Sequence, residues 1–453
     1  MSDAPPDASN PRHPSCILRL ASAVHRFRVP CINPSDALSF EKSFKTCSSS
    51  HQDTIAAMRQ ADVHRNAIKQ AFASAKTSHA AISSSLQEYV PLINQILLSC
   101  SFQPEVARLD KPISFSWMSG VECNQTKKSK YFDSEALMFE LVLSLQTYAL
   151  CESNLGCNSS VSGEFGQALK KFTTATGIFQ FLGQDLLPEW MAKSKQHAEM
   201  EKESLAETRV GVSVALTNLH MAMSQQMAIA TMLVKPEVNY ALLGKLCLGV
   251  AVELESFVST MRSKSAVHMA RMESSFLTFV TFQINIQRAL SLYFLSRSLW
   301  NISEYGVAIA ALSEATVAMR TRTTPTGRGL PEFEEKGPLQ ALSADVSDLR
   351  KHMQVLLSSW EKDNSLVYFD KVPPSVPSNK ALASIQLQKT EEFKLEARDP
   401  LPFSIPGAKN VSISSPPPPS YEDSMNNGNQ RDRSDSDLAR ELHEKLNTKS
   451  ESC

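Results

Sequence analysis

The sequence predicts a mainly all-α protein, organised as a tetratricopeptide-like α-solenoid with an extended segment at the end of its helical body. Helix breakers are nearly absent from the middle of the chain, because only Pro188 and Pro236 of the 24 prolines lie between residues 113 and 324, and the whole chain has 15 glycines. Apolar residues recur there with helical spacing. The helical pattern is then broken by the strand formers Val367, Tyr368 and Phe369, which predict an extended segment, and Pro373 forbids further helix.

Two elements precede this region. Residues 54–98 are rich in alanine and serine and predict a helix that stops or kinks near Pro91. Ile113, Phe115 and Trp117 alternate strictly with serines, so they point to one face of the chain. This alternation predicts one short, half-buried strand.

The remaining elements are helices in series, each with apolar residues on one face. We expect them at residues 134–150, 164–182, 205–234, 238–261, 269–300, 305–319 and 339–360. Antiparallel pairs of this length favour a solenoid, because each pair can cover the apolar face of the next. No strict repeat is visible, and an ordinary helical bundle is the alternative.

Composition excludes several classes of protein. The formal net charge of -1 and the pI of about 6.8 give no field that would attract nucleic acid. The nine cysteines are scattered without a C-x-x-C pair, which favours reduced thiols over a disulfide framework. The apolar stretches at residues 210–234 and 276–295 carry too many polar side chains to face lipid. We therefore expect membrane contact only through partners.

A search for catalytic motifs finds none. The chain has no phosphate-binding loop, no dinucleotide fingerprint, no H-E-x-x-H pair and no G-x-S-x-G elbow. His220 and His268 fall within expected helices and are read as packed or surface histidines. We therefore predict a protein that is not an enzyme and that has no catalytic, cofactor or metal site.

The composition changes after the helical body. We divide the chain into a disordered N-terminus (1–14), a helical domain (15–407), a disordered Pro/Ser/Asn-rich linker (408–434) and a short helix (435–449). The linker contains a P-P-x-Y motif formed by Pro418, Pro419 and Tyr421. Prolines preset the polyproline II conformation that WW domains bind, and SH3 domains are the alternative reader of these prolines.

The end of the chain predicts an amphipathic helix. Leu438, Leu442 and Leu446 recur every four residues and share one helix face. So short a helix is marginal alone, so we expect it to dock on a partner or on the chain's own body, where it could occupy a binding groove. Ubiquitin binding is a further alternative. Cys453 is the last residue, whereas prenylation requires a cysteine as the fourth residue from the end.

Five motifs follow one another along the helical domain. They lie at residues 110–117 (DKPISFSW), 137–149, 168–182 (ALKKFTTATGIFQFL), 304–312 (EYGVAIAAL) and 362–373 (KDNSLVYFDKVP). In this order they resemble the BRO domain family, the ESCRT-associated domain of Alix and its relatives, over residues 15–407. Ser144 and Gln146 depart from the family pattern, which has an asparagine and small residues there.

The resemblance implies a curved, boomerang-shaped solenoid with a small sheet near its N-terminal part and a tail packed back on the helices. Family members bind the C-terminal amphipathic helix of an ESCRT-III subunit, the charged multivesicular body protein, in an apolar groove. Carried over to this sequence, the groove falls on Leu242 and Leu246, with Met227 in place of the family's aromatic residue. The same spacing is also typical of helix core.

Together these features predict a non-enzymatic, cytoplasmic adaptor, peripheral on endosomes. It would bind ESCRT-III in multivesicular body sorting, and its P-P-x-Y tail would recruit a HECT-type ubiquitin ligase through a WW domain. The alternative is a rhophilin-like scaffold for Rho-GTPase or cytoskeletal signalling. An enzyme with an unrecognised site is a further rival.

Overall fold

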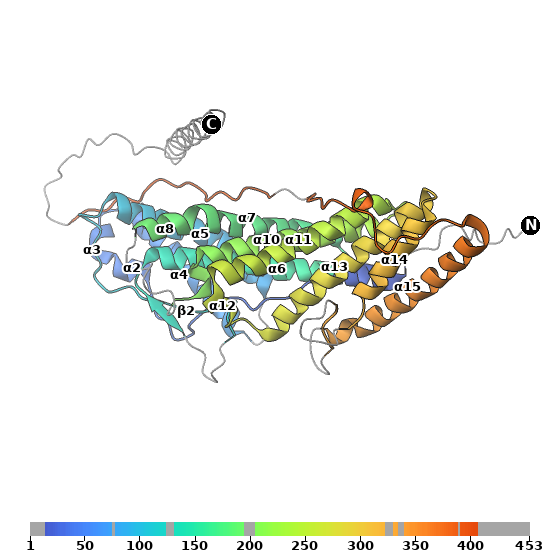
Figure 1. Cartoon of the computed structure of the whole chain (residues 1–453). Helices are drawn as coiled ribbons and strands as arrows, with labels where there is room; N and C mark the ends of the chain where they lie inside the picture. The colour runs from blue at the N-terminus through green and yellow to red at the C-terminus, as the bar shows by residue number, and fades with distance from the viewer. Residues whose placement is uncertain are drawn as a thin grey trace, which may run out of the picture. The chain divides into compact units, whose positions relative to one another are not determined.

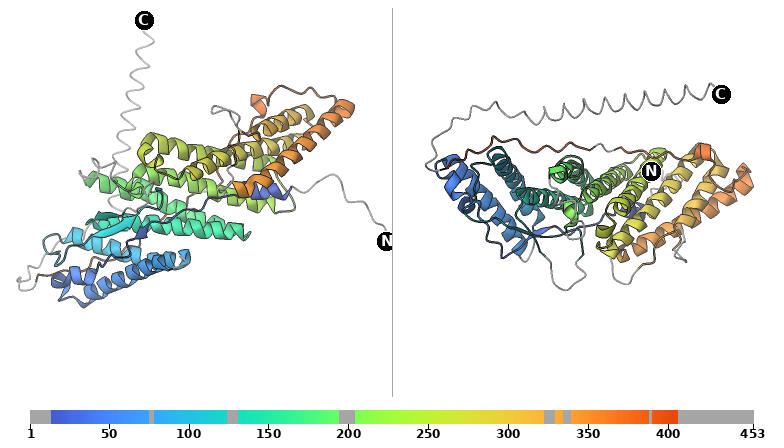
Figure 2. Two further views of the ribbon diagram at one scale, coloured as in Figure 1. Left: turned by 90° about the horizontal axis from the view of Figure 1, so that it is seen from below. Right: turned by 60° about the vertical axis from the view of Figure 1, so that its left-hand side comes forward.

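The computed structural model describes residues 14–74, 78–123, 131–193, 204–321, 329–333, 339–387 and 390–405. These residues fall in the first of two compact units, residues 1–406. Within this unit the helices lie side by side in one curved array, which the two views of Figure 2 show from below and obliquely from one side. The predicted fold class, a mainly helical curved solenoid with a small sheet, is confirmed.

Fourteen α-helices form the described part of the body (Figure 1). They are α1 (Ser15–Ala21), α2 (Phe40–Ser43), α3 (Lys45–Ser48), α4 (Gln52–Ala73), α5 (His79–Phe102), α6 (Leu137–Val161), α7 (Phe165–Phe181), α8 (Leu187–Lys193), α10 (Val210–Leu233), α11 (Tyr240–Lys264), α12 (Ala266–Met269), α13 (Ser274–Asn301), α14 (Tyr305–Ala318) and α15 (Ser343–Asp363). The long helices pack in sequence order from α4 to α15. Helix α1 is the exception, because it packs on α15.

A three-stranded antiparallel sheet lies beside the N-terminal helices. Its strands are β1 (Cys31–Ile32), β2 (Phe115–Met118) and β3 (Phe132–Ser134), in that order. The alternation around Phe115 and Trp117 predicts a strand at β2 correctly, and both side chains are fully buried, but the strand is not half-buried because Ser116 on its other face is buried as well. The sequence gives no comparable signal for β1 and β3, which are only two and three residues long.

The single helix expected over residues 54–98 is wrong, and so is a helix end at Pro91. The structure has two helices there, α4 and α5, separated by residues 74–78. Pro91 lies inside α5 rather than at its end, and it is buried there with its neighbours Val90 and Leu92. Packing on this buried stretch therefore outweighs the loss of one helical hydrogen bond.

A buried ionic network joins these helices to the sheet. The Glu140 carboxylate of α6 accepts hydrogen bonds from Arg65 Nε at 2.8 Å, Tyr89 Oη at 2.9 Å and Trp117 Nε1 at 2.6 Å. Arg65 also donates to Asp36 at 2.8 Å. Because these donors come from α4, α5 and β2, one carboxylate fixes how three elements meet.

The extended segment begins slightly later than its sequence suggests. Helix α15 continues into a π-helical turn at Asn364–Tyr368, so Val367 and Tyr368 are not yet extended. Beyond it the chain runs back over the helices towards α3 (Figure 1), and its regular structure among the described residues is a single 3₁₀ turn, Ser378–Lys380. We call residues 371–405 the strap.

Candidate functional site

The strap lies on a row of helix glycines. Modelling a Cβ atom on Gly306 of α14, Gly249 of α11 or Gly177 of α7 places it 2.2–2.3 Å from a strap carbonyl oxygen. At Gly244 of α11 the same atom would lie 2.6 Å from Leu382 Cδ1. Glycine is therefore needed at Gly306, Gly249 and Gly177 because the strap backbone approaches the helices too closely for any side chain, whereas at Gly244 the close neighbour is a strap side chain.

Gln225 of α10 holds the middle of the strap. Its amide nitrogen Nε2 donates to the carbonyl of Ile385 at 3.0 Å, and its Oε1 accepts from the amide of Leu387 at 2.9 Å. The amide of Ile385 donates to the carbonyl of Lys245 at 3.3 Å. Gln225 is fully buried and binds the strap much as a neighbouring β-strand would.

The far end of the strap reaches the N-terminal helices. Leu401 donates its amide to Ser99 Oγ at 2.7 Å, and Phe403 donates to Gln103 Oε1 at 3.0 Å. The Phe403 ring stacks on Phe44 at a centroid distance of 5.6 Å. The strap thus connects the last helices of the array to the first.

The residues expected to form the ESCRT-III groove lie beneath this crossing. Met227 and Leu246 are fully buried and belong to the core, so neither offers a surface to a partner in this structure. Leu242 is half-buried. Helix α10 presents no aromatic side chain at this point, since Met227 is followed by Ala228 and Ile229, which are also buried. Of the three predicted groove residues, only Leu242 remains available for contact.

A different stripe of α11 faces outwards. Leu248 is half-buried and Val252 is 40% exposed, and they lie one turn apart on the face that also carries Lys245. The strap crosses α11 beside this stripe, since Ile385 contacts Lys245 and Gly249. Sequence reasoning missed Leu248 and Val252 because it took the family's motif positions instead of the outward face.

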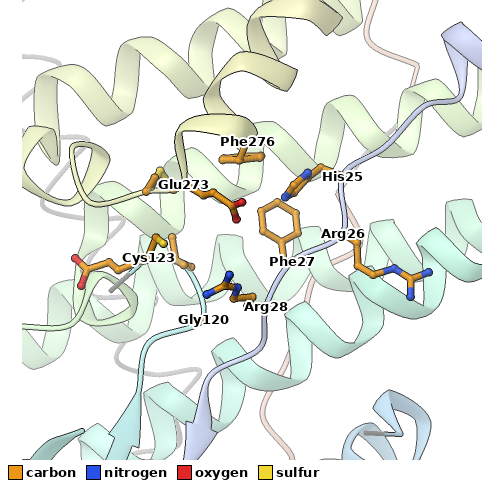
Figure 3. Close-up of a pocket in the computed structure, with 11 residues that line it drawn as sticks. His25, Arg26, Phe27, Arg28, Gly120, Cys123, Glu273 and Phe276 are labelled. Atoms are coloured by element: carbon orange, nitrogen blue, oxygen red, sulfur yellow. The ribbon is translucent and has the colours of Figure 1, made fainter. Parts of the chain in front are cut away.

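A cavity of about 260 Å³ lies elsewhere, where residues 25–28, 120–123 and 272–276 meet (Figure 3). Its wall is aromatic at Phe27 and Phe276, while Arg28 and Glu273 contribute opposite charges. Burial lowers the pKa of His25 to about 4, so this imidazole is neutral at physiological pH. The cavity thus offers an aromatic surface, and with Arg26 and Glu122 its lining carries two arginines and two glutamates.

His220 and His268, which the sequence leaves as either packed or surface histidines, are both buried. Neutral His220 donates from Nδ1 to the Leu216 carbonyl at 2.8 Å and accepts from Ser153 at Nε2 at 2.9 Å. His268 contacts the Glu122 carboxylate through Nδ1 at 2.6 Å. The described residues contain no cluster of three histidine, cysteine, aspartate or glutamate side chains that could hold a metal ion.

Several predicted features lie outside the described residues. These are the N-terminus 1–13, the motif of Pro418, Pro419 and Tyr421, and the terminal leucines Leu438, Leu442 and Leu446. Among the helices that the structure does describe, none combines the length and the apolar character needed to cross a bilayer.

Comparison with solved structures identifies the architecture. One similar structure was determined as the basis for endosomal targeting by the Bro1 domain; its TM-score is 0.61 at 14% identity, over 82% of this chain and 92% of that one. A complex of the ALIX BRO1 domain with CHMP4C has a TM-score of 0.62 at 14% identity, and the match covers 82% of this chain and 96% of that one. ALIX in complex with the SIVmac239 PYKEVTEDL late domain has a TM-score of 0.63 at 15% identity, and the match covers 82% of this chain and 49% of that one.

The comparison with family models agrees with this architecture. The model of the BRO1-like domain matches residues 33–406. No curated protein matches the chain. Because the match covers well over half of the 453 residues, and because the helices and strap form the same fold, this chain belongs to the BRO1-like domain family.

Proposed function

We propose that this protein is a non-enzymatic adaptor that binds an ESCRT-III subunit through its BRO1-like domain during endosomal, multivesicular body sorting. The observation that carries the proposal is the family membership over residues 33–406. The structural likeness to an ALIX BRO1 domain in complex with CHMP4C supports it. On this proposal the protein acts in the cytoplasm, on the surface of endosomes.

The outward stripe of α11, together with Leu242, is the surface that we assign to the ESCRT-III helix. Leu242, Leu248 and Val252 place apolar side chains along about three turns, which suits the apolar face of an amphipathic helix. Lys245 lies among them and can pair with an acidic residue of the partner. With no aromatic anchor on this stripe, we expect micromolar affinity, on the order of -8 kcal/mol.

Titration of the full chain with the C-terminal helix of an ESCRT-III charged multivesicular body protein tests this assignment. Leu248→Asp combined with Val252→Asp should weaken binding at least about tenfold while leaving the thermal transition in place. Val161→Asp is the matched control, because Val161 is 85% exposed at the end of α6. Leu246→Asp should instead unfold the domain, since this side chain is core.

Two outcomes distinguish an error in the assigned surface from an error in the proposed function. Tight binding by the α11 double variant would mean that another face receives the helix. No binding by the wild-type chain to any ESCRT-III helix would remove the adaptor proposal.

We also propose that the P-P-x-Y motif of the tail binds the WW domain of a HECT-type ubiquitin ligase and so recruits the ligase. Pro418 and Pro419 preset the extended conformation, and Tyr421 fills the second pocket of the WW groove. Tyr421→Ala should abolish WW binding and leave ESCRT-III binding unchanged. Titrating a panel of WW domains with the peptide of residues 414–423 provides the measurement, and failure of the wild-type peptide with every domain would refute the motif.

A further inference from the structure

The turn that joins α15 to the strap exposes large apolar side chains. Leu366 and Val367 are each 64% exposed, Phe369 is 74% exposed, and Ile302 of the preceding helix connection is 62% exposed. We call residues 364–370 the distal turn. It projects at the end of the array formed by α14 and α15 (Figures 1 and 2). Soluble surfaces seldom gather so many large apolar groups without a binding role.

The distal turn is held rigidly in this conformation. Asn364 is buried; its Nδ2 donates to the carbonyl of Asp370 at 2.9 Å, and its Oδ1 accepts from the Asp370 amide at 3.0 Å. Phe369 donates its amide to the Asn364 carbonyl at 2.7 Å and adopts φ +56°, a left-handed conformation that is unfavourable for phenylalanine. The backbone is therefore strained in order to present a phenyl ring to the outside.

A cluster of aromatic rings joins the turn to α13, α14 and α15. Tyr368 stacks on Tyr305 with ring centroids 3.6 Å apart, and Trp300 stacks on Trp360 at 4.1 Å. Tyr368 also meets Trp300 edge to face at 5.8 Å. Tryptophan and tyrosine are the side chains that favour the boundary between lipid and water.

We propose that the distal turn inserts into the interfacial region of a lipid bilayer, where the headgroups meet the acyl chains. The turn is a convex projection, whereas a groove would be needed to receive a helix. The turn itself exposes four large apolar side chains, those of Leu366, Val367, Tyr368 and Phe369, against about 20–30 residues on each side of a stable protein interface, so the patch is too small to pair two copies of this chain. The turn combines exposed apolar side chains with tyrosine and tryptophan rings packed next to them. This combination is typical of a segment that anchors at the membrane interface.

The charges near the turn define the kind of surface it binds. Lys362 and Lys371 flank it, but Glu361, Asp363 and Asp370 offset them. Asp370 uses its carboxylate to accept from the amides of Tyr305 and Gly306. Insertion therefore depends on burial of apolar area and needs no acidic lipid. This contact is direct, in contrast to the indirect membrane contact expected from the sequence.

Flotation of the full chain with small vesicles of phosphatidylcholine, alone or mixed with phosphatidylserine, tests the proposal. The wild-type chain should bind both compositions equally, and added salt should not release it. Phe369→Gly should weaken binding by about tenfold or more, because one phenyl ring is lost from the lipid. Its thermal transition should not fall, since glycine accepts the left-handed backbone without strain.

Two further variants make the result decisive. Leu366→Ser combined with Val367→Ser should weaken binding as Phe369→Gly does, whereas Val161→Ser, at an equally exposed apolar site on α6, should bind as the wild type. Absence of vesicle binding by the wild type overturns the proposal. So does equal binding by the Phe369→Gly chain, or binding that requires phosphatidylserine and low salt.

Discussion

His220 shows how one side chain can make stability depend on pH. It is fully buried on α10, with its ring 4.8 Å from Phe179 and 5.7 Å from Phe27 between centroids. Burial among these apolar rings lowers its pKa to about 4, against an ordinary value of 6.5. Between these two values the unfolded chain binds a proton that the folded chain excludes, so stability is lost as the pH falls.

We expect the free energy of unfolding to decrease on acidification from about pH 7 to about pH 5, with His220 contributing up to about 3 kcal/mol over its whole titration. Urea unfolding at several pH values measures it. His220→Asn should flatten the pH dependence even where it lowers stability overall. An unchanged slope in this variant would assign the effect to other histidines, of which His25 has a similarly lowered pKa.

Glu140 carries a different prediction at the same scale. Glu140→Ala leaves Arg65, Tyr89 and Trp117 buried without their shared acceptor. We expect a loss of about 3–5 kcal/mol in the free energy of unfolding, measured in urea. Glu41→Ala is the control, because the Glu41–Arg59 pair is exposed to water and should matter little. Similar losses in both variants would argue against a special role for the buried network.

At the scale of elements, the strap depends on glycines rather than on its own sequence. Gly249→Ala would place a methyl group 2.3 Å from the Ile385 carbonyl oxygen and 2.4 Å from Gln225 Nε2. We expect the free energy of unfolding to fall by about 1–3 kcal/mol and hydrogen exchange at residues 382–387 to become faster. Gly166→Ala on α7 is the control, since nothing lies within 4 Å of the new methyl group. Unchanged exchange in the strap would contradict the close approach.

The elements differ in how far the sequence predicts them. The long helices α6 to α15 follow from apolar periodicity and from the scarcity of proline and glycine, both of which are local signals. Pro91 misleads because its tolerance depends on packing that only the folded array supplies. The spacing of Leu242 and Leu246 is the same for a groove and for a core, so burial of Leu246 could not be read from it.

The path of the strap was even less accessible from sequence. Its contacts are mostly between backbone atoms and glycines, and neither has a distinctive pattern along the chain. Gly177, Gly244, Gly249 and Gly306 were nevertheless a usable signal. Four glycines inside otherwise good helices weaken those helices, so each calls for a reason such as close approach by another segment.

At the scale of the whole molecule, the strap adds contacts that an ordinary solenoid lacks. Repeat arrays are held by neighbouring units, so their ends can unfold separately. Here one segment touches α14, α11, α10, α7 and α5, and we expect a single cooperative transition. Ending the chain after residue 370 should produce two transitions by calorimetry, whereas removal of residues 407–453 should leave one. One transition in both truncated chains would show that the helices alone provide the cooperativity.

The strap and helix α1 together have a consequence for how the protein is made. Helix α1, near the start of the chain, packs on α15, and Ser404 at the far end of the strap donates its amide to the Cys47 carbonyl. A nascent chain leaving the ribosome therefore carries an N-terminal helix whose partner is synthesised more than 300 residues later. Domains commonly fold as units during synthesis, but this one cannot complete its core until almost the whole described chain has emerged. Its early helices must remain soluble, or be shielded by chaperones, throughout that interval.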